Sequence, residues 1–540
     1  MPLESSSRVV QALTRRGFNA EREAVTLIAE SETPELALEA AVERAPDDAL
    51  VLTVAHVREA LAADPVPDPE QVSEDSADSA GPSAAPADTD AGAAGESHAP
   101  THDADPSGST GAATPDRAGE RVDVPHETGG SGSAVGSRSP PTPVVANDMT
   151  GQSTGTGAYD EFVGVFRDRY DRLASQLRGR VNHRPADSVE SMGGGADVEI
   201  IGLVNDIRST ASGHWLIELE DTTGTFPCLV MKDRDIADLV NELLMDECIA
   251  VSGTLADDAG IVFVDAIHFP DVPRTHRPNT ADRHVQAALI SDVHVGSQEF
   301  LGDAWSRFAD WLHTEEAEHV EYLLIAGDMV EGVGVYPNQD EELTIIDIYE
   351  QYETFAEHLK EVPGDVEIVM IPGNHDAVRL AEPQPGFDEE LRGIMSAHDP
   401  QIVSNPAMVD VEGVNILMYH GVSLDEVIAE LPAEKASYDE PHKAMYHLLK
   451  KRHVAPQFGG RTRVAPEERD YLVIDEVPDV FHTGHVHKLG WGKYHNVLAV
   501  NSGCWQAQTD FQKSVNIDPD AGYAPILDLD TLEMTVRKFA

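Results

Sequence analysis

The stretch that decides the fold is Leu-Ile-Ser-Asp-Val-His, at residues 289–294. Its apolar start predicts a short buried strand, and its end places the carboxylate of Asp292 close to the imidazole of His294 in the following loop. Later segments repeat this arrangement, an apolar run followed at once by metal-ligating side chains, at residues 323–328, 368–376, 416–421 and 480–487. In layered α/β folds, ligands collect at the carboxyl ends of strands, so we expect these loops to converge on one site.

The side chains in these loops suit a pair of divalent cations. Such a pair, about 3.5–4 Å apart, needs one bridging ligand and further oxygen or imidazole donors around each ion. Asp328 suits the bridge, because a carboxylate has two oxygens to share and the preceding Gly327 lets the backbone approach closely. The remaining donors are expected to divide between the ions, with Asp292, His294 and His487 at one and Asn374, His420 and His485 at the other.

His375 directly follows one of these expected ligands. It suits a general acid that protonates the leaving oxygen of a phosphodiester. A single histidine on an apolar strand is more often a core residue, and that is our interpretation of His313, His453 and His482. The ordered set of loop motifs argues against the same interpretation for the metal loops.

The excess of acidic residues indicates a protein that works in concentrated salt. The 540 residues include 96 Asp and Glu against 38 Lys and Arg, for a net charge of −58. In dilute buffer such a surface repels nucleic acid, but in salt near 1 M the screening length falls to about 3 Å and acidic side chains keep the protein hydrated. The composition therefore favours a halophile, in which net charge says little about ligands.

The sequence also favours an intracellular protein. Cys228, Cys248 and Cys504 are scattered and odd in number, which supports neither a disulfide framework nor a zinc site and predicts a reducing compartment. The amino terminus lacks a signal-peptide pattern, and no run reaches about 18 apolar residues. We expect a cytoplasmic protein without a membrane partner.

Composition and periodicity divide the chain into segments. Residues 1–63 show helical spacing and predict a small helical interaction domain, with a purely structural appendage as an equal alternative. Residues 64–158 are rich in Asp, Ser, Gly, Ala, Pro and Thr, and predict a disordered acidic linker. Residues 159–195 predict a connecting helix, and residues 284–540 an α/β body that contains the metal loops.

Between helix and body, residues 196–272 contain five short alternating strands, with a helical stretch before the fourth. This is the order of an OB-fold β-barrel, a shape that often binds single strands of nucleic acid. The strand faces lack the interleaved aromatic and basic residues that base stacking needs. A barrel that contacts protein is therefore favoured over one that grips DNA.

The order of the loop motifs is similar to that of the calcineurin-like metallophosphoesterases: Asp-x-His, Gly-Asp, Gly-Asn-His-Asp, a strand-ending His, and Gly-His-x-His. Residues 166–170, 450–456 and 501–513 further resemble the small subunits of archaeal family D DNA polymerases. The order of helical head, tether, OB-fold and phosphoesterase body is also similar, and the resemblance covers most of residues 159–540. The very acidic tether departs from it without affecting a catalytic residue.

This resemblance implies a 3′ to 5′ proofreading exonuclease, with two divalent metal ions as cofactors. Manganese is the first expectation, with magnesium, zinc or iron as alternatives. The expected partners are DNA 3′ ends and a separate large subunit that carries polymerisation. Two rival functions remain: a catalytically silent scaffold, as in eukaryotic small subunits that have lost ligands, and a free-standing phosphoesterase acting on small phosphoesters.

The densest positive charge of the chain lies between the last two metal loops. It comprises Lys450, Lys451, Arg452, Arg461 and Arg463. In so acidic a protein, this cluster is predicted to guide the DNA backbone toward the metals. Contact with an acidic surface of the large subunit is the alternative.

Overall fold

The computed structural model describes residues 3, 5–46, 49–63, 140–153, 157–337, 339–514 and 516–540. Most of the predicted linker therefore lies outside the described residues, but its last part does not. Strand β3 (Val144–Ala146) pairs antiparallel with β13 (Ala407–Val411) at a sheet edge. The predicted linker end at residue 158 is thus wrong, because the β-branched Val144 and Val145 supply an edge strand and Val145 packs on the core.

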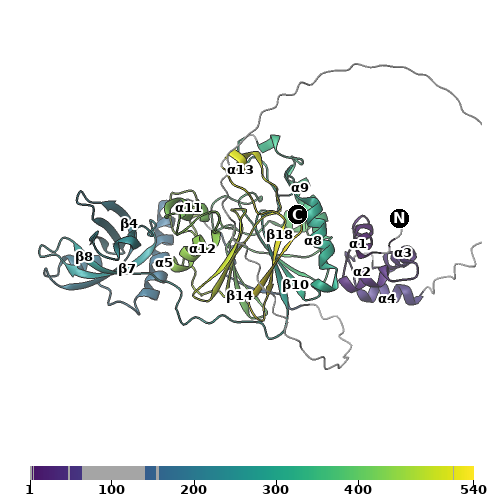
Figure 1. Cartoon of the computed structure of the whole chain (residues 1–540), viewed down its shortest axis with the longest axis horizontal. Helices are drawn as coiled ribbons and strands as arrows, with labels where there is room; N and C mark the ends of the chain where they lie inside the picture. Colours follow the sequence, from purple (N-terminus) through teal and green to yellow (C-terminus); the bar gives the residue numbers. More distant parts are fainter. Residues whose placement is uncertain are drawn as a thin grey trace, which may run out of the picture. The chain divides into compact units, whose positions relative to one another are not determined.

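The first part of the chain folds around an apolar core of its own, which includes Leu13, Val25 and Leu38. Its helices are α1 (Ser6–Thr14), α2 (Arg22–Ala29), α3 (Pro34–Arg44) and α4 (Val54–Ala63), purple in Figure 1. Two short strands, β1 (Asn19–Ala20) and β2 (Val51–Leu52), pair in parallel between them. The helical pattern did not predict these strands, because two residues are too few to show alternation.

Two helices rather than one occupy the segment predicted as a connecting helix. They are α5 (Tyr159–Leu177) and α6 (Ala186–Glu190), and Pro185 stands at the start of the second. Residues 178–185 between them are not helical, and Pro185 suits the start of α6, because a residue there needs no backbone N–H for the helical hydrogen-bond ladder.

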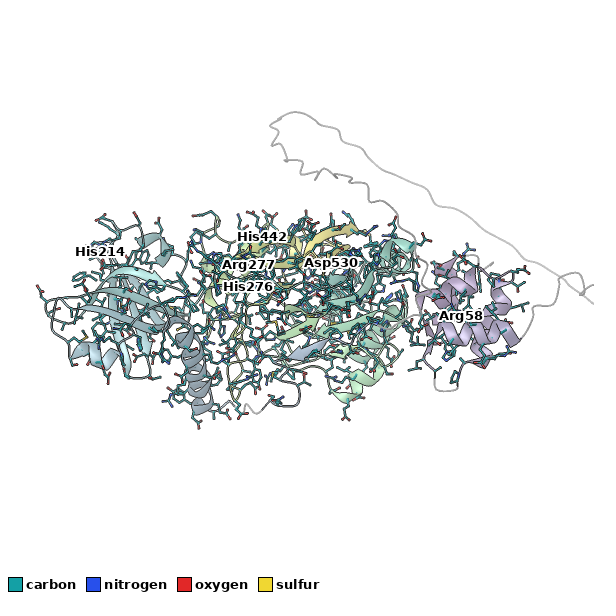
Figure 2. The ribbon with its side chains drawn as sticks, turned by 90° about the horizontal axis from the view of Figure 1, so that it is seen from below. Arg58, His214, His276, Arg277, His442 and Asp530 are labelled. Atoms are coloured by element: carbon teal, nitrogen blue, oxygen red, sulfur yellow. The ribbon has the colours of Figure 1, made fainter. Side chains whose placement is uncertain are left out.

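A closed five-stranded barrel follows, which confirms the predicted barrel. Its strands are β4 (Asp197–Ser209), β5 (Trp215–Asp221), β6 (Gly224–Val230), β7 (Cys248–Leu255) and β8 (Val262–His268), arranged β4-β5-β6-β8-β7, with α7 (Ala237–Val240) before β7. His214, in the turn between β4 and β5, marks the barrel in Figure 2. Strand β4 is much longer than predicted, because it pairs with β7 in its first half and with β5 in its second.

Two six-stranded sheets form the body. The first has the order β12-β11-β10-β9-β18-β19, with β9 (Gln286–Ile290), β10 (Val320–Ala326), β11 (Glu367–Ile371), β12 (Gln401–Ile402), β18 (Tyr523–Asp528) and β19 (Glu533–Lys538). The second has the order β16-β17-β15-β14-β13-β3, with β14 (Val414–Met418), β15 (Val480–Thr483), β16 (Leu489–Tyr494) and β17 (Val497–Ser502). Strands β9, β10 and β11 run parallel in the first sheet, as do β14, β15 and β17 in the second.

The sheets pack face to face through a core that joins Leu289 and Leu324 of one to Ile416 and Val480 of the other. The outer face of the first sheet packs against α8 (Gly302–Leu312), α9 (Ile348–Leu359) and α10 (Glu389–Ile394). The outer face of the second packs against α11 (Leu424–Glu430) and α12 (Pro441–Lys451). Figure 1 shows this order of layers, helices, sheet, sheet, helices. Among the described helices, none is long and apolar enough to cross a membrane.

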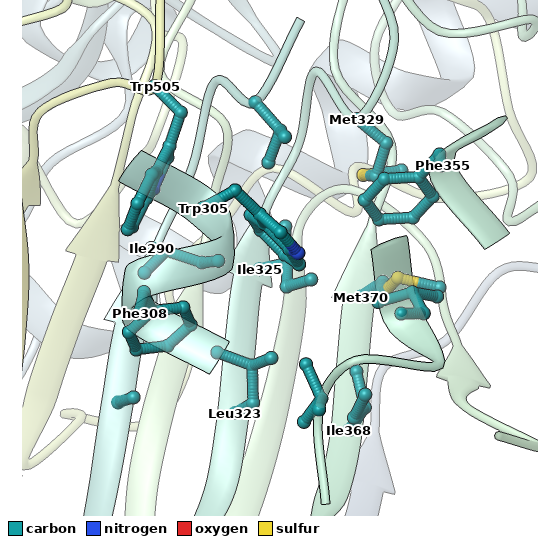
Figure 3. Close-up of a cluster of buried hydrophobic side chains, with 14 of the residues drawn as sticks. Ile290, Trp305, Phe308, Leu323, Ile325, Met329, Phe355, Ile368, Met370 and Trp505 are labelled. Atoms are coloured by element: carbon teal, nitrogen blue, oxygen red, sulfur yellow. The ribbon is translucent and has the colours of Figure 1, made fainter. Parts of the chain in front are cut away.

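An aromatic core fixes the loop that follows β9. Trp305 of α8 packs edge-on against Trp505, with ring centroids 5.6 Å apart, and both lie in the cluster drawn in Figure 3. The backbone N–H of Trp505 donates to the carbonyl of Asp292 at 2.8 Å. Because both rings are fully buried, the position of Asp292 is tied to a closely packed part of the body.

Three of the five basic residues predicted to guide DNA instead have partners within the protein, and two of them, Lys450 and Lys451, join the barrel to the body. Lys451 is fully buried, with Nζ 2.7 Å from the carboxylate of Glu247, and Lys450 lies 2.8 Å from that of Glu242. The guanidinium of Arg452 donates to the carbonyl of Ile474 at 2.9 Å. For these residues the prediction is wrong, because a basic run in the sequence does not reveal acidic partners some 200 residues away.

Arg169 connects helix α5 to the body. Its Nε donates to the carboxylate of Asp470 at 2.6 Å, and both side chains are buried. His453 Nε2 lies 3.0 Å from the same carboxylate. Although burial opposes ionisation, the charges of Arg169 and His453 hold the pKa of Asp470 well below its usual range.

Asp470→Asn is therefore expected to lower the free energy of unfolding at pH 7 by about 3–5 kcal/mol, because Arg169 loses its charge partner while buried. The folded pKa lies below the unfolded value of about 3.9, so the stabilisation is complete above about pH 5 and is lost as the pH falls. Denaturant unfolding at constant high salt should show the gap between wild type and variant narrowing below about pH 4. The exposed Asp257, changed to Asn, is the control; a gap independent of pH would contradict the assignment.

Candidate metal centre

The strand-end loops meet at one edge of the two sheets, where their side chains surround a cavity of about 200 Å³. The loops follow β9, β10, β11, β14 and β15. Of the seven expected ligands, five are buried: Asp292, His294, Asp328, His420 and His487. Asn374 and His485 are half-buried, as is the expected general acid His375.

The backbone of these loops is strained. Five of the expected ligands have a positive φ: Asp292 (52°), His294 (56°), Asp328 (54°), His485 (72°) and His487 (53°). The left-handed conformation costs a residue with a side chain roughly 1–2 kcal/mol. Such strain persists where the surrounding structure holds it, and it gathers at functional sites.

Asp292, His294 and His487 form one group of donors within 4.8 Å of one another. The Nε2 atoms of His294 and His487 lie 3.1 Å apart, and Asp292 Oδ1 lies 3.4 Å from the Nε2 of His487. Gln512 Nε2 lies 2.8 Å from the Nδ1 of His487, the ring nitrogen away from the group. A hydrogen bond to Nδ1 fixes the ring so that Nε2 faces the other donors.

Asp328 and His420 form a second group, in which Asp328 Oδ2 lies 3.2 Å from His420 Nε2. Asn374 Oδ1 lies 3.0 Å from the same nitrogen. His420 Nδ1 donates to the carbonyl of Ala326 at 2.8 Å, which turns Nε2 toward the site.

Asp328 stands between the groups, as a bridge must. Its Oδ2 lies 3.8 Å from His294 Nε2 in the first group as well as 3.2 Å from His420 Nε2 in the second. Asp292 also approaches both groups, which the sequence did not predict. His485 is less closely placed, since its ring centroid is 5.2 Å from that of His420 and its Nε2 is 3.5 Å from the carboxylate of Asp425.

Two glycines allow this close approach. Gly327 has a φ of 93°, and a Cβ there would lie 2.5 Å from His420 Nδ1. A Cβ at Gly373 would lie 2.2 Å from Asp328 Oδ1. The expected role of Gly327 is thus confirmed, and Gly373 has a matching one.

Glu331 contacts two histidines of the site, and no sequence pattern predicted its role. One oxygen of its buried carboxylate lies 2.9 Å from His294 Nδ1 and accepts a hydrogen bond from Gln506 at 2.7 Å. Its backbone carbonyl accepts a hydrogen bond of 2.7 Å from His375 Nδ1. Despite burial, the charge of His294 lowers the pKa of Glu331 to about 2. The available signal was an acidic residue three positions after Asp328, in a loop already assigned to the site.

The donor set fits divalent cations. Carboxylate, amide and imidazole donors together suit the ions expected from the sequence. Asp292 and Asp328 are buried close together, and buried carboxylates need compensating positive charge. Burial opposes ionisation of Asp328, yet the charges of His420 and His375 hold its pKa well below the usual range.

The histidines interpreted as core residues have ordinary structural partners. Burial lowers the pKa of His482 to about 3, and its Nε2 lies 3.1 Å from Ser502 Oγ. His313 Nε2 bonds to the carbonyl of Glu361 at 3.0 Å. His453 contacts Asp470, as described above.

The fold and the site together define a mixed α/β protein in which a five-stranded barrel is joined to a body with a histidine and aspartate centre. The family of the B-type subunits of DNA polymerases alpha and epsilon matches residues 287–489. The DNA polymerase II small subunit of Halobacterium salinarum is 64% identical over 540 residues, which is 100% of both chains. That of Archaeoglobus fulgidus is 45% identical over 386 residues, 70% of this chain and 77% of its own.

The DNA polymerase II small subunit of Methanocaldococcus jannaschii is 38% identical over 394 residues, 71% of this chain and 66% of its own. This chain belongs to the family of DNA polymerase II small subunits, which are the small subunits of archaeal family D DNA polymerases. The family expected from the sequence is thus confirmed. Among solved structures, the asparaginyl-tRNA synthetase from Pyrococcus horikoshii matches 16% of this chain and 22% of its own at 16% identity, with a TM-score of 0.15.

Proposed function

We propose that the body is a calcineurin-like metallophosphoesterase and that the chain supplies a 3′ to 5′ proofreading exonuclease to a replicative DNA polymerase. One observation supports this above all: His294, Asp328, His485 and His487 line one cavity together with His375, and Asp292 and His420 lie in donor groups with these ligands. A scaffold that had lost catalysis would not need to retain buried, strained carboxylates and imidazoles.

In this proposal Asp292, His294 and His487 would hold one divalent cation, Asn374, His420 and His485 would hold the other, and Asp328 would serve both. Manganese is the first candidate, with magnesium, zinc or iron as alternatives. When bound, such a pair supplies Lewis-acid chemistry toward the phosphate and an activated water.

His375 has the geometry of a proton donor. Its Nδ1 donates to the carbonyl of Glu331, which leaves Nε2 as the nitrogen that can face the reaction, and the imidazolium form of the ring carries a transferable proton there. For removal of the last nucleotide, the leaving group is the 3′ oxygen of the nucleotide before it. We assign to His375 the protonation of that oxygen, and to Glu331 the orientation of the His375 ring.

The chain is further proposed to assemble with a large catalytic subunit, whose polymerase site would share DNA 3′ ends with the centre described here. The helices of residues 5–63 are proposed as an interaction domain. Of the five basic residues predicted to guide DNA, only Arg461 and Arg463 are still proposed for that role, because both side chains are exposed.

The test uses the full chain assembled with its large subunit in high salt. Given a divalent cation and a labelled strand with a mismatched 3′ end, the assembly should release mononucleotides from that end, faster than from a matched duplex. Small phosphoesters and cyclic nucleotides are assayed in parallel. Hydrolysis of those alone favours a free-standing phosphoesterase, and no hydrolysis with any of the four metals favours the silent scaffold.

A further inference from the structure

An exposed aromatic pair stands at the rim of the cavity. Phe511, on the short helix α13 (Asp510–Ser514), lines the cavity and is 59% exposed. Its ring stacks on that of Tyr336, with centroids 6.3 Å apart and an angle of 27° between the planes. Tyr336 also contacts His375, and these two rings meet edge-on with their centroids 6.2 Å apart. The pair therefore lies beside the proposed proton donor.

Tyr336 is held in place. Its hydroxyl lies 3.0 Å from the carboxylate of Glu331 and 3.2 Å from that of Glu342. Burial and these carboxylates raise the pKa of Tyr336, so the ring remains a neutral phenol. A fixed ring loses little conformational freedom when a ligand stacks on it.

Phe511 is also tied to the site. The next residue, Gln512, contacts His487 in the first group of donors. The side chain of Phe511 is nevertheless largely exposed to solvent, so most of its apolar surface is not stabilised by burial. A fixed backbone that presents an exposed aromatic ring is the arrangement of a stacking platform.

The size of the cavity indicates which part of a nucleotide the platform would meet. Pockets that enclose a whole drug-sized ligand occupy about 300–1,000 Å³. This cavity, at about 200 Å³, lies below that range. It has room for a phosphate and part of a sugar at the donors, which leaves the base at the rim.

We propose that Phe511 and Tyr336 bind the base of the 3′-terminal nucleotide by stacking, and so hold the last phosphodiester against His375. This inference rests on the proposed exonuclease function and names its substrate subsite. Every base has an aromatic face, so the subsite accepts any sequence, as proofreading demands. A base reaches it only after leaving the duplex stack, which costs least at a mismatch. The platform thereby selects frayed and mismatched 3′ ends.

A binding experiment tests the stacking directly. The probe is an oligonucleotide with 2-aminopurine as its 3′-terminal base, added to the assembled enzyme in which His375→Ala prevents cleavage. Stacking quenches the fluorescence of this base. We expect Phe511→Ala to abolish most of the quenching, Phe511→Trp to retain it, and a probe with 2-aminopurine far from the 3′ end to be unaffected.

A kinetic experiment separates a base subsite from a structural role. With an ordinary 3′-terminal nucleotide, Phe511→Ala should lower kcat/KM by roughly 5- to 150-fold, the value of one base–aromatic stack. With an abasic 3′-terminal residue, the same substitution should change kcat/KM little. The matched control is Phe263→Ala on β8 of the barrel, an aromatic side chain that is 40% exposed and far from the cavity in sequence.

The outcomes are distinguishable. Equal losses on normal and abasic ends, or unchanged quenching, overturn the stacking platform while leaving the exonuclease in place. Failure of Phe511→Ala to assemble with the large subunit also overturns it and makes the pair a protein interface. If wild type hydrolyses nothing but quenching depends on Phe511, the base subsite stands and the proposed exonuclease falls.

Discussion

Asp328→Ala is expected to release both divalent cations and to abolish removal of 3′-terminal nucleotides. The reason is the central position of this carboxylate, whose Oδ2 lies 3.2 Å from His420 Nε2 and 3.8 Å from His294 Nε2. Its other oxygen accepts the backbone N–H of His375 at 2.8 Å. Removing the carboxylate therefore takes a donor from both groups and frees the loop of the proton donor at once.

Metal analysis of the full chain, purified in high salt, should fall from about two ions per chain to near zero. The control is Asp257→Ala, which removes an exposed acidic residue of the barrel and should leave the metal content unchanged. Thermal unfolding in the presence of a chelator separates loss of metal from loss of fold. Unchanged stoichiometry in Asp328→Ala, with a folded protein, would exclude this residue as the bridge.

That the donor side chains of the candidate site come together was predictable, because each one is local to its strand. An apolar run that ends in Asp or His shows both the strand and the donor in fewer than ten residues. The parallel strands then bring the loops to one edge without further information. Gly327 was predictable from its place directly before Asp328, although the atom it makes room for, His420 Nδ1, lies on a distant loop.

Contacts between distant segments were not predictable in this way. Lys451 reads as a surface cation in the sequence and is a buried partner of Glu247 in the structure. Glu331 shows no periodic signal, and its importance comes from ring nitrogens on two other loops. Strand β3 escaped notice because its partner β13 lies more than 250 residues away in the chain. Burial and pairing of this kind are set by tertiary packing, which local patterns do not contain.

The proposed platform and the proposed proton donor would let one site accept any base and still select 3′ ends. In the proposed function, the metal groups and His375 act on a phosphodiester, which is the same at every position of a strand. Selection of the 3′-terminal nucleotide must then come from the rim, where Tyr336 joins His375 to Phe511. Changes at the rim should alter which ends are cut, whereas changes at His375 should alter the rate for all ends.

His375→Ala is accordingly expected to retain both metals and the fold but to lose roughly 10²–10⁴-fold in hydrolysis of a 3′-terminal nucleotide. The metals should remain because His375 contacts Asp328 through its backbone N–H, which alanine preserves. The activity should fall because the 3′ oxygen then leaves without a proton. Polymerisation by the assembled enzyme, measured in parallel, should be largely unchanged, since its residues lie on the large subunit in the proposed function.

Two comparisons separate proton donation from metal binding. Asp292→Asn should weaken cation binding, so added metal should restore part of its activity, whereas metal should not rescue His375→Ala. The exposed His319, changed to Ala, serves as the control for loss of a histidine. Metal content is determined on each variant before the assay, so that any loss of activity is assigned to one cause.

The decisive substrate is thymidine 5′-phosphate esterified with p-nitrophenol, whose leaving group departs as a stable anion and needs no proton. His375→Ala should hydrolyse this ester at close to the wild-type rate while remaining slow on an ordinary 3′ end. If the variant is equally slow on both, His375 acts in binding or positioning and the general acid lies elsewhere. If it trims mismatched ends as fast as wild type, the catalytic role of His375 is wrong, because a donor on Nε2 beside the leaving oxygen cannot be lost without cost.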